Sequence, residues 1–482
     1  MDQAQTPVVA GRSALVTEMG TGDLGDHRLD ARRDRLISVL EQHPDAAFPD
    51  ACADDAEVEA LYRFLRNPRV TLASLVEPHL VATQARCAAL GDVLVIHDTT
   101  DMVFAGEAAR PGLAPLGPAR HGFWVHAALA VSAEGYRAPL GLLAVQPFVR
   151  KMRPRGTAKP ATATRFVDPD KESRYWAEGV AAVRTRLGTS SHPIHVMDRA
   201  GDSYELFAEM IARHDRFVIR LNHDRRVVPT DGVSRVREAG TRSAVLGQRT
   251  VTVSSRRAGD RSPEARQRHP PREGRAATVQ FTACPLTVQR PYGRAYAHLP
   301  ATLQVQVVSA WELVPPAGEE PVDWRLITTE PIDTIEQVLR IVDWYRTRWL
   351  IEEFFKALKT GCAYEKRQLE SLETLLIALA LLAPIAWQLL LLRHLARADP
   401  AAPASAVLSS RQLQVLHHLP AGTHLGLTPT AGEALLLVAR LGGHLRQNGA
   451  PGWLVLGRGL QKLRWMEAGW ASATTHARCD QS

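Results

Sequence analysis

Three carboxylates stand where two strands and a helix could bring them to one site. Asp98 follows the apolar run of VLVIHDTTD, a pattern that predicts a buried strand ending at this aspartate. Asp198 ends PIHVMD, a second predicted buried strand, and Glu352 lies in a predicted helix. Oxygen ligands of this kind suit Mg²⁺ or Mn²⁺. Two such ions can activate a water or a 3′-hydroxyl and stabilise the leaving oxygen of a phosphodiester, so the pattern indicates phosphoryl transfer on nucleic acid.

Each carboxylate also has a structural interpretation. Asp98 could simply accept hydrogen bonds in a turn formed by DTTD. Asp202 has helix-cap spacing with the glutamate three residues later, so we expect Asp202 to be structural and Asp198 to be the ligand. Glu353 competes with Glu352 for the third place. Only Glu352 lies on a polar stripe of the same segment, and that decides the choice.

The polar stripe lies in YRTRWLIEEFFKALKTG, which begins at Tyr345. Tyr345, Arg348, Glu352 and Lys359 fall within an arc of about 60° along about 21 Å, provided that the segment forms one helix. Apolar residues border this stripe, which favours a position beside a cleft. The simpler interpretation is a solvated helix face, because Arg348 and Glu352 have the spacing of an ordinary i,i+4 ion pair.

The elements around these residues alternate between strand and helix. The chain looks helical from residue 1 to about 85, strand-like after Asp98, helical around 171–187, and strand-like again in RFVIRLN after Asp198. From about 223 to 320 it becomes a series of short β-prone pieces. A Pro/Arg-rich tract at 255–275 interrupts them and predicts a loop. VDWRLITT predicts one more strand.

The helix that carries the polar stripe is expected to begin near Asp333, which has capping-box spacing with Glu336. From residue 370 onward the chain is rich in leucine and alanine and mostly helical. The charge-free stretch 375–392 is long enough for a membrane span. We expect a buried helix instead, because Pro384 and Gln388 interrupt it and no second span accompanies it.

Composition narrows the class of protein. With 482 residues and 45% hydrophobic residues, the chain can bury a large core and should form two to four domains. The net charge of +7 favours an acidic partner, and nucleic acid fits better than a membrane because no basic amphipathic helix stands out. Five cysteines without CxxC spacing argue against a zinc site or a disulfide framework and fit a reducing cytoplasm. No signal peptide is evident at the N-terminus.

Three blocks together resemble a known family. IHDTTD, VMDRAGDSYE and YRTRWLIEEFFKALKTG are similar to the signature blocks of the bacterial cut-and-paste DDE transposases of the insertion-sequence-four class. The third block has the family's spacing of Tyr, two residues, Arg, three residues, Glu, six residues and Lys at every position. LGDHRLDARR and ALYRFLRNPRVT are similar to the family's DNA-binding region, HGFWVHAAL to its core, and the helical tail to its dimerisation region.

The resemblance implies a fold. We expect a multidomain α/β (α+β) protein with a ribonuclease-H-like mixed-sheet core and a β-rich insertion at about 223–320. A helical DNA-binding domain would occupy residues 1–85, the catalytic domain residues 86–370, and a helical dimerisation region residues 371–482.

The resemblance also implies roles for particular residues. Asp98, Asp198 and Glu352 would hold two Mg²⁺ or Mn²⁺ ions and would be catalytic. Phosphates of the transposon end would be held by three residues of the polar stripe, Tyr345, Arg348 and Lys359.

Two tryptophans and further basic residues complete the expected DNA contacts. Trp324 would stack near a base extruded from the duplex, and Trp349 would help to hold it, although either ring could instead be an ordinary core aromatic. Arg220 and the basic loop from Arg256 to Arg275 would follow the DNA backbone.

The implied activity is transposition. The protein would bind inverted terminal repeats as a homodimer, cut double-stranded DNA through a hairpin intermediate, and join the 3′ ends to target DNA, without contact with a membrane. We expect it in the cytoplasm, associated with the nucleoid. Two alternatives stay open: a ribonuclease-H-like structure-specific nuclease or resolvase, and a catalytically silent protein that binds transposon ends and inhibits transposition.

Overall fold

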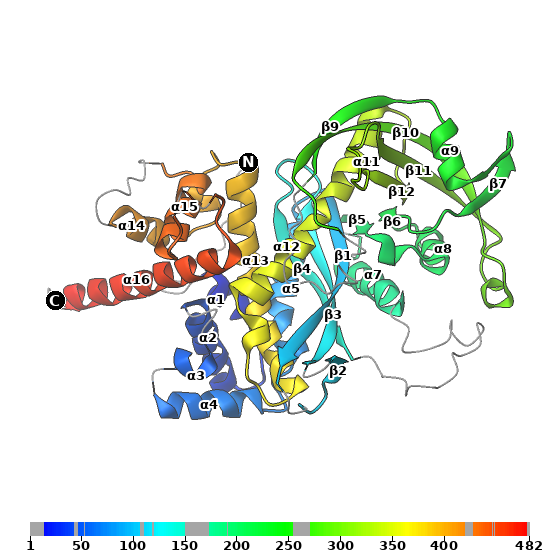
Figure 1. Cartoon of the computed structure of the whole chain (residues 1–482). Helices are drawn as coiled ribbons and strands as arrows, with labels where there is room; N and C mark the ends of the chain where they lie inside the picture. The colour runs from blue at the N-terminus through cyan, green and yellow to red at the C-terminus, as the bar shows by residue number, and fades with distance from the viewer. Residues whose placement is uncertain are drawn as a thin grey trace. The chain divides into compact units, whose positions relative to one another are not determined.

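A computed structural model describes most of the chain, and the chain forms two compact units (Figure 1). The described residues are 14–42, 47–52, 54–106, 110–117, 120–149, 173–189, 191–253, 270–419, 428–445, 447 and 449–479. Unit 1 consists of Met1–Thr157, Glu178–Ser191 and Trp349–Ser482. Unit 2 consists of Ala158–Ala177 and His192–Arg348.

The N-terminal part of unit 1 is helical, as the sequence predicts. Its helices are α1 (Ala14–Met19), α2 (His27–Gln42), α3 (Phe48–Ala51), α4 (Asp55–Leu65) and α5 (Leu72–Ala88). Asp54 caps α4 by accepting the Glu57 backbone N–H at 2.8 Å. A reciprocal capping box of Thr71 and Ser74 starts α5. Both caps satisfy backbone donors that a helix start otherwise leaves unpaired.

The strands of unit 1 form an antiparallel arrangement around one central strand. They are β1 (Asp92–Ala105), β2 (Ala114–Gly117), β3 (Arg120–Ser132) and β4 (Pro139–Phe148). β3 pairs with β1 along one edge and with β2 and β4 along the other. Figure 1 shows β1 and β3 side by side.

The prediction that the first strand ends at Asp98 is wrong. β1 continues to Ala105, and Asp98 lies in its middle, opposite Ala127 of β3. The polar residues after Asp98 do not end the strand because pairing with β3 requires only backbone groups. Every second side chain beyond them, Met102 and Phe104, is buried again.

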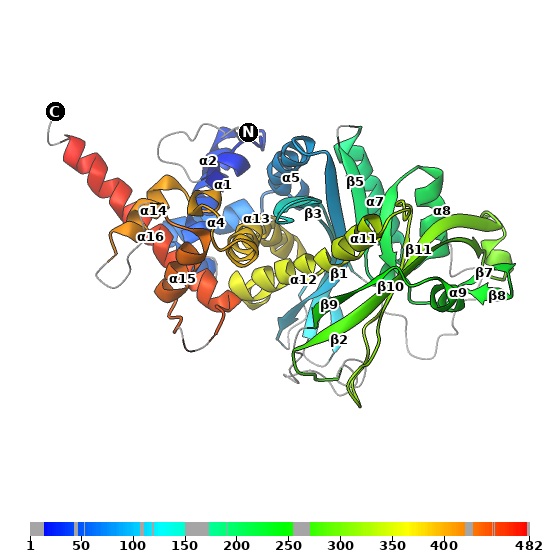
Figure 2. The ribbon, with the colours of Figure 1, turned by 90° about the horizontal axis from the view of Figure 1, so that it is seen from above.

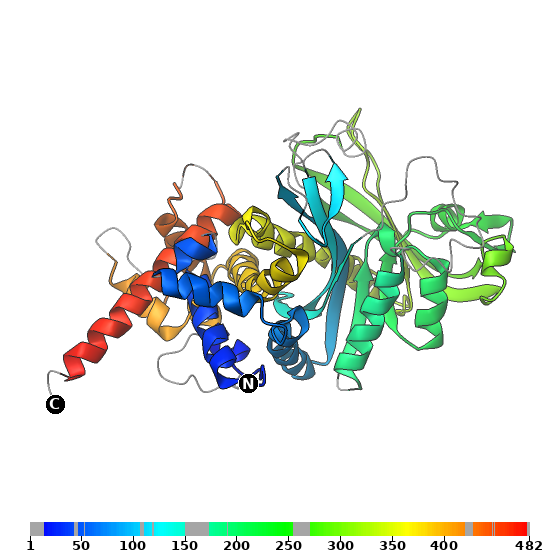
Figure 3. The same ribbon diagram turned by 90° about the horizontal axis from the view of Figure 1, so that it is seen from below.

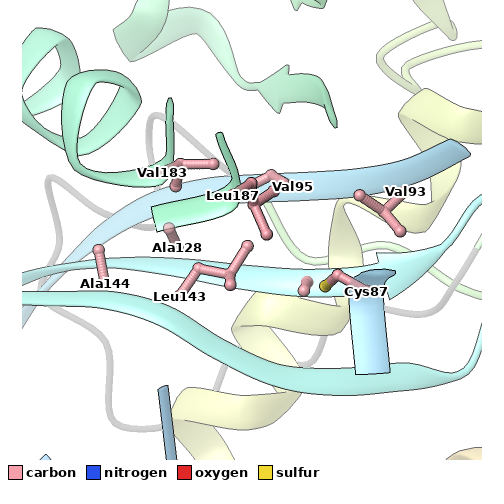
Figure 4. Packing of buried hydrophobic residues seen from close by; sticks show 9 residues of the cluster. Cys87, Val93, Val95, Ala128, Leu143, Ala144, Val183 and Leu187 are labelled. Atoms are coloured by element: carbon pink, nitrogen blue, oxygen red, sulfur yellow. The ribbon is translucent and has the colours of Figure 1, made fainter. Parts of the chain in front are cut away.

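An apolar cluster of unit 1 packs helices against these strands (Figure 4). It joins the end of α5, three strands and the C-terminal half of α7 (Ser173–Leu187). The labelled members are Cys87, Val93, Val95, Ala128, Leu143, Ala144, Val183 and Leu187. The cluster lies on the face of β1 that carries its odd-numbered residues.

The C-terminal part of unit 1 is also helical, as predicted. It contains α12 (Trp349–Lys356), a π-helical turn η3 (Ala357–Gly361), the turns η4 (Tyr364–Lys366) and η5 (Ala404–Ala406), and the helices α13 (Leu372–Ala398), α14 (Ser410–His417), α15 (Ala431–Leu441) and α16 (Trp453–Cys479). Figure 3 shows α16, in red, running past the blue N-terminal helices, of which it contacts α2. Arg464 of α16 donates a hydrogen bond of 2.5 Å to the Glu41 carbonyl oxygen.

Helix α13 is long and apolar enough to cross a membrane, but 83% of its most apolar window is buried in the protein. It packs against α5, β4, α15 and η3. The Trp387 indole donates a hydrogen bond of 2.9 Å to the Pro139 carbonyl oxygen. The prediction of a buried helix at 375–392 is therefore confirmed.

Unit 2 contains a mixed sheet. In sheet order its strands are β5 (His192–Met197), β6 (Arg216–Arg220), β12 (Asp323–Thr328), β11 (Thr302–Glu312), β10 (Arg275–Gln289), β7 (Arg226–Thr230) and β8 (Val233–Arg235), and β9 (Gly247–Val253) also pairs with β10. β5 and β6 are parallel, and the other pairs are antiparallel. Among the described residues of the predicted β-rich segment at 223–320, which exclude 254–269, the structure thus has five strands, β7 to β11.

The helices of unit 2 include α8 (Tyr204–Ala212), α9 (Val236–Arg242) and α11 (Ile335–Thr347), with short 3₁₀ turns η1 (Arg199–Gly201) and η2 (Arg294–Tyr296). Figure 2 shows α9 beside β10, which it contacts. α11 packs against β6 and β11. It begins one residue later than predicted: Thr334 is the N-cap and Gln337 completes the capping box, so Asp333 and Glu336 do not play these roles.

The prediction of one continuous helix for the polar stripe is wrong. α11 ends at Thr347, and the Arg348 backbone N–H donates to the Tyr345 carbonyl oxygen at 3.0 Å, a bond of the tighter 3₁₀ type. α12 begins at Trp349. Lys359 then lies in the π turn, which is wider than an α-helical turn and changes its angular position. The arc of about 60° assumed a straight α-helix and does not apply here.

Candidate active site

The side chain of Asp98 lies on the face of β1 that carries the even-numbered residues. Its neighbours His97 and Thr99 both contact His126 of β3 on the other face. Phe104, which shares the face of Asp98, packs edge-on against Tyr364 of η4, with 5.6 Å between ring centroids. Asp98 therefore faces the helical layer that follows α12 in the chain.

Glu352 lies in the first turn of α12, and α12 packs against β1 within unit 1. Its neighbour Glu353 has other partners: Lys356 Nζ lies 2.8 Å from Glu353 Oε1, and Arg393 of α13 forms an ion pair with Glu353 Oε2. Burial raises the pKa of Glu353, but the hydrogen bond and charge of Lys356 and the charges of Arg393 and Arg397 outweigh it, and the net pKa is lowered. Glu353 fastens α12 to α13, and Glu352 remains the candidate ligand.

Asp198 directly follows β5, as the sequence predicts. Its Oδ1 accepts the Ala200 backbone N–H at 2.8 Å and so caps the turn η1. Asp202 is structural, as predicted, but it is not a helix cap, because Ser203 is the N-cap of α8. The Asp202 carboxylate is fully buried and turned towards the loop after β6, where it forms an ion pair with Arg225.

Unit 1 holds two of the three predicted carboxylates on elements that pack together, β1 with Asp98 and α12 with Glu352. Asp198 belongs to unit 2. Within the described ranges, no three His, Cys, Asp or Glu side chains form a ready-made metal cluster. The donor set fits hard cations, because all three groups are carboxylates. The metal-binding triad stays a prediction.

Two predicted DNA contacts of unit 2 lie together. The Trp324 and Tyr345 rings pack edge-on with 5.7 Å between centroids, and Tyr345 is buried. Arg220 Nη2 donates a hydrogen bond of 2.9 Å to the Asp323 carbonyl oxygen, next to Trp324 in the chain.

Sequence reasoning missed one cation of unit 2, Arg199. Burial and then the charge of Arg220 lower the pKa of Arg199, and Tyr345 also interacts with it electrostatically. Two neighbouring cations of this kind would be stabilised by a phosphate. Its position directly after Asp198 could have identified Arg199 as a candidate from the sequence.

Two predicted DNA contacts of unit 1 have protein partners. Lys359 Nζ lies 2.5 Å from the Asp101 carbonyl oxygen and 3.3 Å from the carboxylates of both Asp101 and Glu365. Trp349 is 49% exposed, and Lys356 Nζ lies 4.7 Å from its ring centroid. Trp349 is therefore a surface aromatic, and core packing does not explain it.

Two parts of the chain match known protein families. Residues 171–387 match the Transposase DDE domain, and residues 12–70 match the Transposase DNA-binding domain. Together they span more than half of the chain. The chain is a member of the DDE transposases. The DDE match contains Asp198 and Glu352, whereas Asp98 precedes it.

This DDE transposase has the predicted fold class, a ribonuclease-H-like core within a multidomain α+β protein. Proteins of this family generally use divalent cations. A solved structure, "piggyBac transposase synaptic complex with hairpin DNA", is similar over 71% of this chain and 55% of that chain, at 11% identity and a TM-score of 0.32.

The DNA-binding match of this DDE transposase covers α1 to α4, and its arginines differ in exposure. Arg28 is exposed, but Arg33 is buried and forms an ion pair with Asp30 at 2.9 Å. Arg33 therefore stabilises the helices and does not present its charge on the surface. Most of the basic loop predicted at 256–275 lies outside the described residues.

Proposed function

We propose that this chain is a cut-and-paste DNA transposase of the insertion-sequence-four class. It binds inverted terminal repeats, cleaves double-stranded DNA at them, and transfers the 3′ ends to target DNA. The main support is the DDE match that contains Asp198 and Glu352, together with Asp98 on the strand against which α12 packs. The Tyr-Arg-Glu-Lys spacing of the third block supports the class.

Asp98, Asp198 and Glu352 would hold two Mg²⁺ or Mn²⁺ ions per active site. When bound, such ions would activate a water or a 3′-hydroxyl of the DNA as the nucleophile and stabilise the leaving oxygen. The protein's own contribution is orientation. The Ala200 backbone N–H fixes one oxygen of Asp198, and the ion pair of Glu353 with Arg393 holds the helix that carries Glu352.

The phosphates of the transposon end would be held by Tyr345, Arg348 and Lys359. Arg199 and Arg220 would add cationic charge next to Tyr345. Lys359 has to exchange Asp101 and Glu365 for a phosphate, which is a modest barrier because Lys359 is 21% exposed and such ion pairs are weak near water.

Cleavage would pass through a DNA hairpin. A tight hairpin bend costs deformation energy, and extrusion of a base relieves it. Trp324 would stack on the extruded base, and the exposed ring of Trp349 would help to hold it. Stacking of one base on an aromatic ring is worth about 1–3 kcal/mol.

The organisation of the chain follows from this activity. Residues 1–85 would bind the terminal repeat, residues 86–370 would catalyse, and residues 371–482 would form a homodimer that pairs two ends. The protein would work in the cytoplasm on the nucleoid, and the burial of α13 gives no reason to place it in a membrane.

The test supplies linear DNA that carries the element's ends, together with Mg²⁺, to the full chain and to Asp98→Ala, Asp198→Ala and Glu352→Ala. We expect hairpin intermediates and joined products with the native chain and none with the three variants. Cleavage that persists in all three variants would disprove the site. Cuts without hairpins or joining would indicate a nuclease, and binding without cleavage would indicate a silent inhibitor.

A further inference from the structure

Three hydrogen-bonded polar side chains, two of them fully buried, lie behind Asp98, on the opposite face of the strands of unit 1. His126 of β3 is the middle member and stands opposite Thr99 in the register of β1 and β3. His126 Nδ1 lies 2.9 Å from Thr99 Oγ1, and His126 Nε2 lies 3.3 Å from His97 Nδ1. One imidazole therefore binds both residues that flank Asp98.

The two histidines have closed surroundings. His97 and His126 are fully buried, and their rings stack with 5.5 Å between centroids. A Cβ atom on Gly179 of α7 would lie 2.7 Å from His126 Nε2 and 3.2 Å from His97 Nδ1, so the helix backbone packs directly on the pair. Buried polar groups are costly unless they are hydrogen-bonded. A neutral imidazole, with one donor and one acceptor, satisfies one partner on each side.

The position of these three side chains lets them restrict the backbone at Asp98. Side chains alternate along a strand, so the backbone that points His97 and Thr99 to one face points Asp98 to the other. Fixing both flanking side chains to one buried ring restricts rotation and slippage of β1 at Asp98. We propose that His126 is a positioning residue that orients the Asp98 carboxylate for a divalent cation. This inference rests on the proposed role of Asp98.

The experiment measures Mn²⁺ binding and does not depend on turnover. The full chain, in complex with end-bearing DNA, is titrated with Mn²⁺, and free Mn²⁺ is followed by electron paramagnetic resonance. His126→Leu removes both hydrogen bonds, and Thr99→Val removes one with little change of shape. We expect the dissociation constant for Mn²⁺ to rise about 10-fold or more, as is typical when the support of a metal ligand is lost. His126→Gln keeps a donor and an acceptor and should recover part of the affinity.

Val183→Ala is the matched control. Val183 belongs to the apolar cluster on the same face, so its truncation lowers stability without touching the residues next to Asp98. We expect it to lower the melting temperature and leave the Mn²⁺ dissociation constant unchanged. If Val183→Ala weakened Mn²⁺ binding as much as His126→Leu does, the weaker binding would reflect a general loss of stability. That result would overturn the inference.

Asp98→Asn separates the two proposals. If Asp98→Asn weakens Mn²⁺ binding but His126→Leu and Thr99→Val bind Mn²⁺ like the native chain, the positioning role is wrong and the metal site stands. If Asp98→Asn also binds like the native chain, the proposed metal site itself is wrong. Should His126→Leu fail to fold, Thr99→Val decides the positioning role alone.

Discussion

Two aspartates four positions apart should respond in opposite ways to removal of their carboxylates. Asp198 is half-buried and accepts a hydrogen bond of 2.8 Å from the Ala200 backbone N–H. The side chain of Asp202 is fully buried and accepts the backbone N–H groups of Asn222 at 2.6 Å and His223 at 2.8 Å. The Asp202 side chain also accepts a hydrogen bond of 2.7 Å from Arg225 Nε. We predict that Asp202→Ala destabilises unit 2, whereas Asp198→Ala abolishes cleavage with little loss of stability.

The magnitudes follow from burial. Arg225 is only 8% exposed, so Asp202→Ala leaves its guanidinium without its buried counter-charge, which typically costs about 3–5 kcal/mol. That is a large part of an ordinary stability of about 5–15 kcal/mol. Asp198→Ala removes one hydrogen bond at the start of a three-residue turn, worth about 1 kcal/mol.

Amide hydrogen exchange, measured by mass spectrometry, is the suitable assay because it reports locally in a chain with two units. A loss of about 3 kcal/mol raises local opening about 100-fold, since each 1.4 kcal/mol is a factor of ten. The exchange rates of the Asn222 and His223 amides should rise by this amount in Asp202→Ala and by less than 10-fold in Asp198→Ala. Melting curves of both variants provide the global comparison.

A second substitution tests the reason for the loss. Replacing Arg225 by methionine in the Asp202→Ala chain removes the uncompensated charge, so the double variant should be more stable than Asp202→Ala alone. Native exchange rates at Asn222 and His223 in Asp202→Ala would refute the reasoning. So would a double variant less stable than the single one.

Three further predictions concern unit 1. Arg393→Gln breaks the ion pair with Glu353, so the free energy of unfolding should fall by about 1–3 kcal/mol and cleavage should slow while DNA affinity in a gel-shift assay is unchanged. Burial lowers the pKa of His79 below its ordinary value of 6.5. The unfolded chain therefore binds a proton that the folded chain does not, and stability should fall as pH drops through 6.5 towards the folded pKa. Melting temperatures measured between about pH 5 and about pH 7.5 check this dependence, and His79→Gln should make it weaker. Trp349→Ala should leave the melting temperature nearly unchanged, because the ring is 49% exposed, and should weaken a 2-aminopurine signal from an extruded base in hairpin DNA.

Periodicity predicted the elements better than it predicted their ends. The end of β5 at Met197, directly before Asp198, was readable because the apolar run stops where the strand stops. The end of β1 was not, because polarity reports which face a side chain occupies, and pairing with β3 continues past Asp98. The break at Arg348 was invisible, since good helix formers continue on both sides of it.

Partners distant in the chain could not be predicted from local patterns. The burial of Arg33 was not readable from LGDHRLDARR, although Asp30 and Asp34 nearby gave a hint of its ion pairs. The structural role of Asp202 was predicted for the wrong reason, because its partner Arg225 lies 23 positions away, beyond the reach of capping rules. The three signature carboxylates came from spacing and resemblance, and their assembly still awaits the cleavage test.

The burial of α13 has a consequence for how the protein is made. A ribosome completes this helix before it completes α15 and α16, and α15 is one of the elements that cover α13. Until then the nascent chain exposes one side of its most apolar segment to the cell. A truncated protein that ends before Ala431 would lack α15, so this side of α13 would stay exposed. We expect such products of genes with a premature stop codon to aggregate or to be degraded.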